Sequence, residues 1–282
     1  MATTAAVALG QCGLAEPGRG RPALISPGPP EGLYVHFPFC ISLCPYCDFV
    51  VMAGAAARGP GQRVDALLGA LHRELDLRAG TRDQAGAEGP APLRSVYLGG
   101  GTPSLMSAEQ VHELLRHIDE RLGIAADAEI TLEANPGADE IGDLAGFRAA
   151  GVGRLSLGAQ SMDDGQLRRL GRRHRAADVG AAVRGARAAG IGSVNVDLLT
   201  DVPGQDVASW RATLEDVLAL EPDHLSAYTL TLDDPDTEGL TGPEGDHLPV
   251  SRGARAWRER AATEQSDERA AEMELVADEL AS

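Results

Sequence analysis

Positively charged side chains are scarce in this sequence of 282 residues, which contains no lysine. The 25 basic residues, all arginines, stand against 42 aspartates and glutamates and leave a formal net charge of −17. The summed field of such a chain repels phosphate backbones and anionic membrane surfaces. The composition therefore disfavours nucleic-acid binding.

Cysteine is rare as well, and the four cysteines are unevenly placed. Cys40, Cys44 and Cys47 fall within eight residues, whereas Cys12 stands alone near the start. Secreted disulfide frameworks use an even set of well-spaced cysteines. The observed pattern instead favours metal or redox chemistry in a reducing cytoplasm.

Long apolar runs are absent, although 43% of the residues are hydrophobic, which is enough for a sizeable core. No segment reaches the length of a membrane-spanning helix. Residues 1–14 also lack the basic start and the compact apolar stretch of a secretory signal. We therefore expect a globular, cytoplasmic protein without a membrane span.

The chain divides into three parts by composition. Residues 1–32 are rich in Ala, Gly and Pro without periodicity, which predicts a disordered tail. Residues 33–235 alternate short β-like runs with longer helical runs, which predicts an α/β core with a parallel sheet. Residues 236–282 are predicted to be a linker followed by a single polar, weakly amphipathic helix.

Within the core, about six βα repeats suit a partial barrel or an open doubly wound sheet, and in both the site lies at the strand C-termini. The expected strands are 33–37, 95–98, 129–133, 154–157, 193–198 and 224–230. The expected helices are 63–78, 108–122, 139–150, 164–170, 177–189 and 208–220, with solvated loops at 53–62 and 79–92.

Three cysteines spaced four and three residues apart follow the first expected strand. The thiolates of Cys40, Cys44 and Cys47 can ligate three irons of a 4Fe–4S cluster and leave the fourth iron open to a substrate or cofactor. A structural zinc site would need a fourth ligand at suitable spacing, and the nearby His36 lies inside the strand. Zinc and free thiols remain the alternatives, and Cys12 is interpreted as a bystander.

A glycine-rich turn, Gly99–Gly100–Gly101–Thr102, follows the second expected strand. Absent side chains let backbone groups approach a ligand closely. The lysine of a Walker loop and the spacing of a dinucleotide fingerprint are both missing. By itself the turn is equally well explained as a plain βα connection.

Seven ordered motifs resemble the coproporphyrinogen III oxidase-like family of radical S-adenosylmethionine (SAM) proteins. They are Tyr34–Cys40 with its Cys-x-x-x-Cys-x-x-Cys, Gly99–Pro103, Glu133–Pro136, Ser156–Ser161, Gly171–His174, Asp197–Leu199 and Pro203–Gln205. The resemblance covers residues 33 to about 230. It implies a radical SAM partial (β/α)6 barrel with a parallel sheet, followed here by a C-terminal helical tail.

The resemblance also implies the cofactors and their ligands. Cys40, Cys44 and Cys47 would hold the 4Fe–4S cluster, and SAM would chelate its open iron. The implied SAM-binding residues are Tyr34, Tyr46, Gly100, Gly101, Thr102, Glu133, Gln160, Arg172 and Asp197, with Thr229 as a weaker candidate.

Several of these residues also have plain structural interpretations. Glu133 can bind ribose hydroxyls or a cationic ligand, or be a surface carboxylate. Arg172 can fork onto a carboxylate, or belong to the solvated charge run of Arg168, Arg169, Arg173 and Arg175. Asp197 ends an apolar strand, where an unpaired charge is costly. Gln160 and Tyr228 can simply satisfy core hydrogen bonds.

The residues after the third cysteine distinguish two branches of the family. Porphyrinogen-oxidising members carry a further cysteine two residues after the third ligand, whereas Asp48 and Phe49 follow Cys47 here. The segment is similar to the HemW-type heme chaperones, which bind heme and hand it to acceptor proteins. The resemblance thus implies heme as a ligand, an electron donor and a heme-acceptor protein. An oxygen-independent coproporphyrinogen III oxidase acting on a porphyrinogen is the alternative.

Two departures from the family pattern leave further hypotheses open. Asp201 stands where a glycine is usual, and it would be strained if the backbone there needs a positive φ. The chain ends at Ser282 without the family's later His-Asn and Tyr-Trp signature, which predicts a shortened C-terminal region. An inactive truncated paralogue and a zinc-binding interaction module therefore remain as hypotheses.

Overall fold

The computed structural model describes residues 7–8, 31–53, 62–83, 91–232 and 252–281. Within these residues, one sheet has the strand order β1-β2-β5-β6-β7-β8-β9. Strand β1 (Val7–Ala8) pairs antiparallel with β2, and every other neighbouring pair is parallel. The parallel strands are β2 (Gly32–Phe37), β5 (Leu93–Gly100), β6 (Ile124–Ala134), β7 (Arg154–Gln160), β8 (Ser193–Thr200) and β9 (His224–Thr229).

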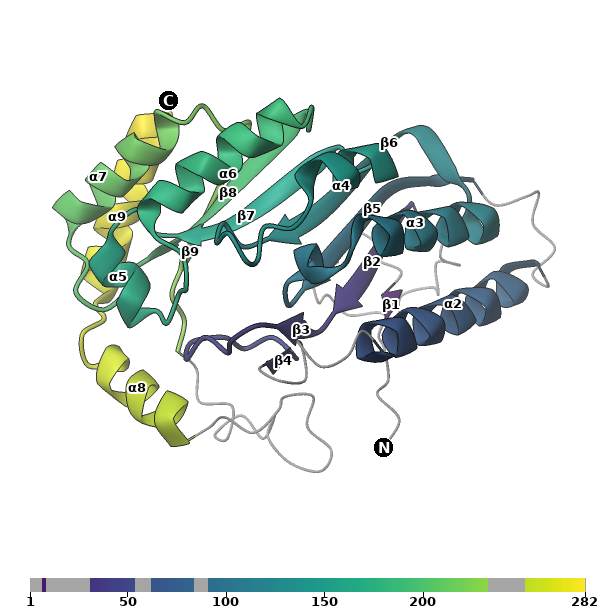
Figure 1. Cartoon of the computed structure of the whole chain (residues 1–282). Coiled ribbons are helices and arrows are strands. Elements are labelled where there is room, and N and C mark those ends of the chain that lie inside the picture. Colours follow the sequence, from purple (N-terminus) through teal and green to yellow (C-terminus); the bar gives the residue numbers. More distant parts are fainter. Residues whose placement is uncertain (1–6, 9–30, 54–61, 84–90, 233–251, 282) are drawn as a thin grey trace, which may run out of the picture.

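The order of the parallel strands in space equals their order in the chain. A doubly wound sheet would reverse its order at a switch point, whereas a barrel adds each strand on the same side of the last. The predicted parallel α/β fold is confirmed, and the partial barrel is the architecture that forms. Helices follow one another along the sheet, with α2 and α3 at one end and α7 at the other (Figure 1).

Helix α3 (Ala108–Leu122) illustrates why the helices form where they do. Ser107 caps it through a reciprocal capping box with Gln110, and Gly123 ends it with a φ of 72°. Its apolar residues recur at helical spacing and are buried against the core, namely Val111, Leu114, Leu115, Ile118 and Leu122. The expected bounds of this helix are confirmed.

The other helices keep their expected order with shifted ends. They are α2 (Gln62–Asp83), α4 (Leu144–Ala150), α5 (Asp164–Arg169), α6 (Ala176–Ala188) and α7 (Val207–Leu218). Helix α4 starts five residues later than predicted because Asp143 caps it through Gly146 N and Gly142 adopts a φ of 73°. Helix α2 runs five residues into the expected loop 79–92, and Ala79 is buried there.

The C-terminal region contains two helices where one was expected. Helices α8 (Arg252–Ala262) and α9 (Asp267–Ala281) are separated by a short turn. Met273 and Val276 of α9 are buried, and the indole of Trp210 donates to the Met273 carbonyl at 2.8 Å. The weak amphipathicity of this segment therefore did not predict that α9 packs on α7.

The connection after β2 carries the cysteines and is braced by a small parallel pair, β3 (Phe39–Cys40) and β4 (Met52–Ala53). A 3₁₀ turn, η1 (Pro103–Leu105), follows the glycine-rich turn. Most of the tail predicted to be disordered and the linker 236–251 lie outside the described residues. None of the helices in the described ranges is long and apolar enough to cross a membrane.

Candidate functional site

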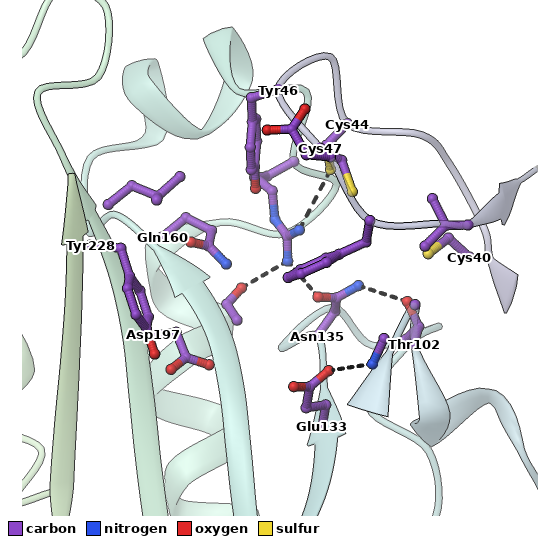
Figure 2. A pocket seen from close by; sticks show the side chains of 18 of the residues that line it. Cys40, Cys44, Tyr46, Cys47, Thr102, Glu133, Asn135, Gln160, Asp197 and Tyr228 are labelled. Carbon is purple, nitrogen blue, oxygen red and sulfur yellow. Dashed lines mark hydrogen bonds between the residues drawn. The ribbon is translucent and has the colours of Figure 1, made fainter. Parts of the chain in front are cut away.

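A cavity of about 440 Å³ opens at the C-terminal ends of the parallel strands. One wall is the cysteine-bearing connection after β2, and the floor consists of residues at the ends of β5, β6, β7 and β8. Figure 2 shows Cys40 at one end of this space and Tyr228 of β9 at the other. The position is the one predicted for a barrel of parallel strands.

All three clustered cysteines line the cavity as free thiols. Burial raises the pKa of Cys40 to about 11 and that of Cys47 to about 12. With pKa values this high, the thiols of Cys40 and Cys47 are protonated at neutral pH, and a metal group that binds their thiolates must displace protons.

The three thiols form a donor set suited to a metal group. In a 4Fe–4S cube each thiolate ligates a different iron, and three thiolates leave the fourth iron open. The donor set of three thiols around one cavity fits the cluster.

The glycine-rich turn packs tightly against the cysteine-bearing connection. Gly101 N donates to the Phe37 carbonyl at 2.7 Å, and Thr102 N donates to the Phe39 carbonyl at 2.8 Å. A Cβ added at Gly101 would lie 2.7 Å from the Phe39 carbonyl oxygen, and Gly100 has a φ of 110°. Glycine is therefore required at both positions. Gly100, Gly101 and Thr102 all line the cavity, as the sequence predicted.

Glu133 lies at the end of β6 on the cavity floor. Its Oε1 accepts a 2.8 Å hydrogen bond from the Tyr97 hydroxyl, and its Oε2 accepts a 2.9 Å bond from Gly100 N. Burial raises the pKa of this carboxyl, and the nearby Asp197 raises it further, while the two donated bonds oppose them. Glu133 is therefore a carboxylate that two hydrogen bonds fix in the cavity, and its interpretation as a surface residue is wrong.

Arg172 lies beside the second cysteine. Its guanidinium donates to the Gly158 carbonyl at 2.7 Å, to Asn135 Oδ1, and to Cys44 Sγ at 3.5 Å. Its Nε is buried and, among the described residues, has no hydrogen-bond partner. Arg172 is therefore no part of a solvated helix face, and its guanidinium places positive charge next to Cys44.

Asp197 is paired within the barrel, as expected for a charge on an apolar strand. Its Oδ2 accepts from Ser156 Oγ at 2.9 Å and its Oδ1 from Asn195 Nδ2 at 2.7 Å. The carboxylate still lines the cavity and lies near Glu133. Two anchored carboxylates therefore share the floor of the site.

Of the remaining predicted residues, all but Tyr34 line the cavity. Tyr46, Gln160 and Thr229 line the cavity. Tyr34 is absent from the lining, since its hydroxyl bonds His36 Nδ1 at 3.0 Å and its ring stacks on Tyr97. The structure therefore does not bring Tyr34 to the site.

Among the lining residues that the sequence analysis did not predict, Asn135 and Tyr97 hold other site residues in place. Asn135 bridges Arg172 to Thr102 and to the buried Glu140. It lies two residues after Glu133, so strand alternation was a signal for its inward position. Tyr97 also lies on the floor, and nothing in its sequence surroundings distinguished it from a core tyrosine.

Comparison with known proteins places this cavity in context. A model of the Radical SAM superfamily matches residues 34–217. The "Heme chaperone HemW" of Haemophilus influenzae is 39% identical over 205 residues, which cover 73% of this chain and 52% of that protein. The "Radical S-adenosyl methionine domain-containing protein 1, mitochondrial" of Bos taurus is 39% identical over 215 residues, covering 76% and 46%. The chain thus spans about half the length of these curated relatives.

A solved structure shares both fold and sequence with the chain. It is the "Coproporphyrinogen III oxidase (HemN) from Escherichia coli", with a TM-score of 0.68 and 28% sequence identity. The match covers 86% of this chain and 51% of that one.

Proposed function

Because the chain belongs to the radical SAM superfamily, we propose that it holds a 4Fe–4S cluster on Cys40, Cys44 and Cys47, binds SAM beside it, and handles heme. The observation that carries the first part is the shared cavity. Three thiols form one wall and two anchored carboxylates, Glu133 and Asp197, lie on the floor. The carboxylates complement a cationic sulfonium ligand, and the guanidinium of Arg172 in the same cavity complements an anionic cluster.

The residues of the chain have distinct roles in this proposal. When bound and reduced, the cluster supplies the electron for reductive cleavage of SAM. Glu133 and Asp197 accept hydrogen bonds from ligand hydroxyls or amines. Arg172 presents positive charge beside Cys44, where it stabilises anionic cluster sulfur or a ligand carboxylate. Asn135 keeps that guanidinium in place.

Heme handling rests on the relatives and on the mouth of the cavity. The relative from Haemophilus influenzae is described as a heme chaperone, and Asp48 and Phe49 follow Cys47 as in that branch. Leu43, Phe49 and Tyr228 line the cavity yet are exposed. A large flat apolar ligand would cover these side chains. The heme-acceptor protein, the electron donor and the cytoplasmic location stay predictions.

Oxidation of coproporphyrinogen III is the second candidate, because the solved HemN structure matches this chain over 86% of its length. The two candidates differ in product. A chaperone binds heme and leaves a porphyrinogen unchanged, whereas the oxidase converts propionate side chains of the porphyrinogen.

The first experiment is anaerobic reconstitution with iron and sulfide, followed by electron paramagnetic resonance of the reduced protein with and without SAM. We expect a 4Fe–4S signal that SAM shifts, that Cys44→Ala abolishes, and that the control Cys12→Ala retains. A wild type that takes up no cluster, or takes up zinc instead, contradicts the proposal.

Heme titration and product analysis then separate the two candidates. Stoichiometric heme binding monitored by absorbance, with coproporphyrinogen III unchanged under reducing conditions with SAM, supports the chaperone. Decarboxylated product without heme binding supports the oxidase.

A further inference from the structure

Helix α8 packs against the cysteine-bearing connection from outside the cavity. It belongs to residues 252–281, which lie beyond the residues 34–217 that match the superfamily model. In Figure 1, α8 lies at the end of the molecule where the chain after β3 turns back. Two consecutive side chains of α8, Trp257 and Arg258, contact that connection.

Arg258 binds the connection around the third cysteine. Its Nε donates to the Pro45 carbonyl and its Nη2 to the Cys47 carbonyl, both at 3.1 Å, and Nη2 also bonds the carboxylate of Asp48. The side chain of Arg258 is only 8% exposed. A planar guanidinium presents five donors in a fixed fork that spans separated acceptors, whereas the three donors of an ammonium group radiate from one nitrogen.

Trp257 adds a second attachment. Its indole nitrogen donates to the Arg169 carbonyl at 2.9 Å, and its ring lies 6.4 Å from that of Tyr46, centroid to centroid. Tyr46 stands between Cys44 and Cys47 and lines the cavity. Helix α8 therefore contacts the stretch that contains two of the three proposed cluster ligands.

The turn after α8 is fixed to the barrel, so the helix is not a loose cover. Asp201 at the end of β8 accepts from Ser266 N at 3.1 Å and from Arg269 Nε at 2.7 Å. Gln265 reaches the carbonyls of Asp201 and Leu230. This network holds the C-terminal end of α8 against the strand ends that surround the cavity.

We propose that Arg258 is a positioning residue for the cluster and that the Arg258–Asp48 pair sets its reduction potential. The inference rests on the proposed 4Fe–4S site. The guanidinium orders the two carbonyls around Cys47 and places a positive charge next to a cluster that becomes more negative on reduction. Asp48 partly cancels this charge, and the two residues therefore act on the potential in opposite directions.

The test uses the full chain and four variants. Arg258→Gln removes the charge and most of the donors, Arg258→Lys keeps the charge without the fork, and Asp48→Asn removes the opposing charge. Arg260→Gln is the control, because Arg260 is an exposed arginine on the same helix. Each protein is reconstituted anaerobically and checked for folding by circular dichroism. Its reduction potential is then measured by potentiometric titration, with the electron paramagnetic resonance signal of the reduced cluster as the readout. Loss of the cluster to a chelator gives the second readout.

We expect opposite shifts of the potential, more negative for Arg258→Gln and less negative for Asp48→Asn, with Arg260→Gln unchanged. Arg258→Lys is expected to stay near the wild-type potential but to lose its cluster to the chelator several-fold faster, because the two carbonyls are no longer bridged. If Arg258→Gln fails to hold a cluster, the upward shift in Asp48→Asn and the faster loss in Arg258→Lys still decide the question.

Wild-type potentials and loss rates in all three pair variants would overturn the inference while leaving the proposed function intact. A shift of the same sign in Arg258→Gln and Asp48→Asn would also overturn it, since only loop disorder would then be at work. A wild type that holds no cluster overturns the proposed function, and this inference falls with it.

Discussion

The hydroxyl of Tyr97 donates a 2.8 Å hydrogen bond to Glu133 across two neighbouring parallel strands. With Gly100 N on the other oxygen, both carboxylate oxygens are held before any ligand enters. Pre-orientation of this kind lowers the entropic cost of binding. The pair therefore bears directly on affinity for the ligand of the cavity.

Tyr97→Phe is expected to weaken SAM binding by about 3- to 10-fold, the equivalent of one hydrogen bond of roughly 1 kcal/mol. Isothermal titration of reconstituted protein under anaerobic conditions measures it. Tyr34→Phe is the matched control, because Tyr34 bonds His36 outside the cavity lining. Equal losses in both variants would contradict the placement of Tyr34 in the structure and restore the contact implied by the sequence.

Asp201 has the strained backbone conformation that the sequence analysis considered, and its side chain makes a compensating ion pair. Its φ is 55°, the left-handed conformation for which the family's usual glycine is suited. Its side chain is nonetheless buried, and it binds Ser266 N and the Arg269 guanidinium on the C-terminal segment. The strain is thus offset by a buried ion pair that glycine could not make.

Asp201→Asn is expected to lower the free energy of unfolding by about 1–3 kcal/mol, because Asn tolerates the backbone conformation but leaves the Arg269 charge without its partner. Asp201→Gly is expected to cost a similar amount despite the relief of strain. Urea unfolding measures both. Arg211→Gln breaks an exposed pair with Glu279 and should cost under about 0.5 kcal/mol. If Asp201→Gly is as stable as the wild type, the ion pair does no more than offset the backbone strain at residue 201, and the expected loss is wrong.

Much of the fold follows from local patterns, and the exceptions have a common cause. The alternation of strand and helix runs predicted each parallel strand, because periodicity and turn residues are properties of neighbours in the chain. The attachment of the turn between α8 and α9 to the barrel uses Asp201 and Arg269, which are 68 residues apart. Such contacts leave no local trace.

The site residues likewise fall into those that local sequence predicted and those that depend on long-range contacts. The spacing of the cysteines predicted a metal site from the sequence alone, whereas the glycine-rich turn became a ligand candidate only through the resemblance to the family. Tyr34 was carried over from a motif although its side chain faces His36, and Tyr97 was missed although it holds Glu133. A single sequence does not reveal which of two tyrosines on adjacent strands reaches a cavity.

His174 closes the Gly171–His174 motif and makes the stability of the protein sensitive to acid. The residue is 3% exposed, and its Nε2 bonds the Ala159 carbonyl at 2.9 Å. Burial lowers the pKa of His174 to about 4, the positive charge of Arg172 lowers it further, and the Ala159 carbonyl with Asp178 and Asp164 acts in the opposite direction. The imidazole is therefore neutral in the folded protein at physiological pH.

Below a pH of about 6.5 the unfolded chain takes up a proton on this histidine that the folded protein does not, so the unfolded state gains stability as the pH falls. The contribution of the neutral histidine is complete above pH 6.5 and is lost progressively toward pH 4, on the order of 3 kcal/mol in total. Between pH 7.5 and 5.0, the urea-unfolding free energy of His174→Gln should therefore fall by about 2 kcal/mol less than that of the wild type. His112→Gln, at an exposed position, should keep the wild-type dependence. Parallel curves for all three proteins would mean that the pKa of His174 is the same in the folded and unfolded states, contrary to the lowering expected from its burial and from Arg172.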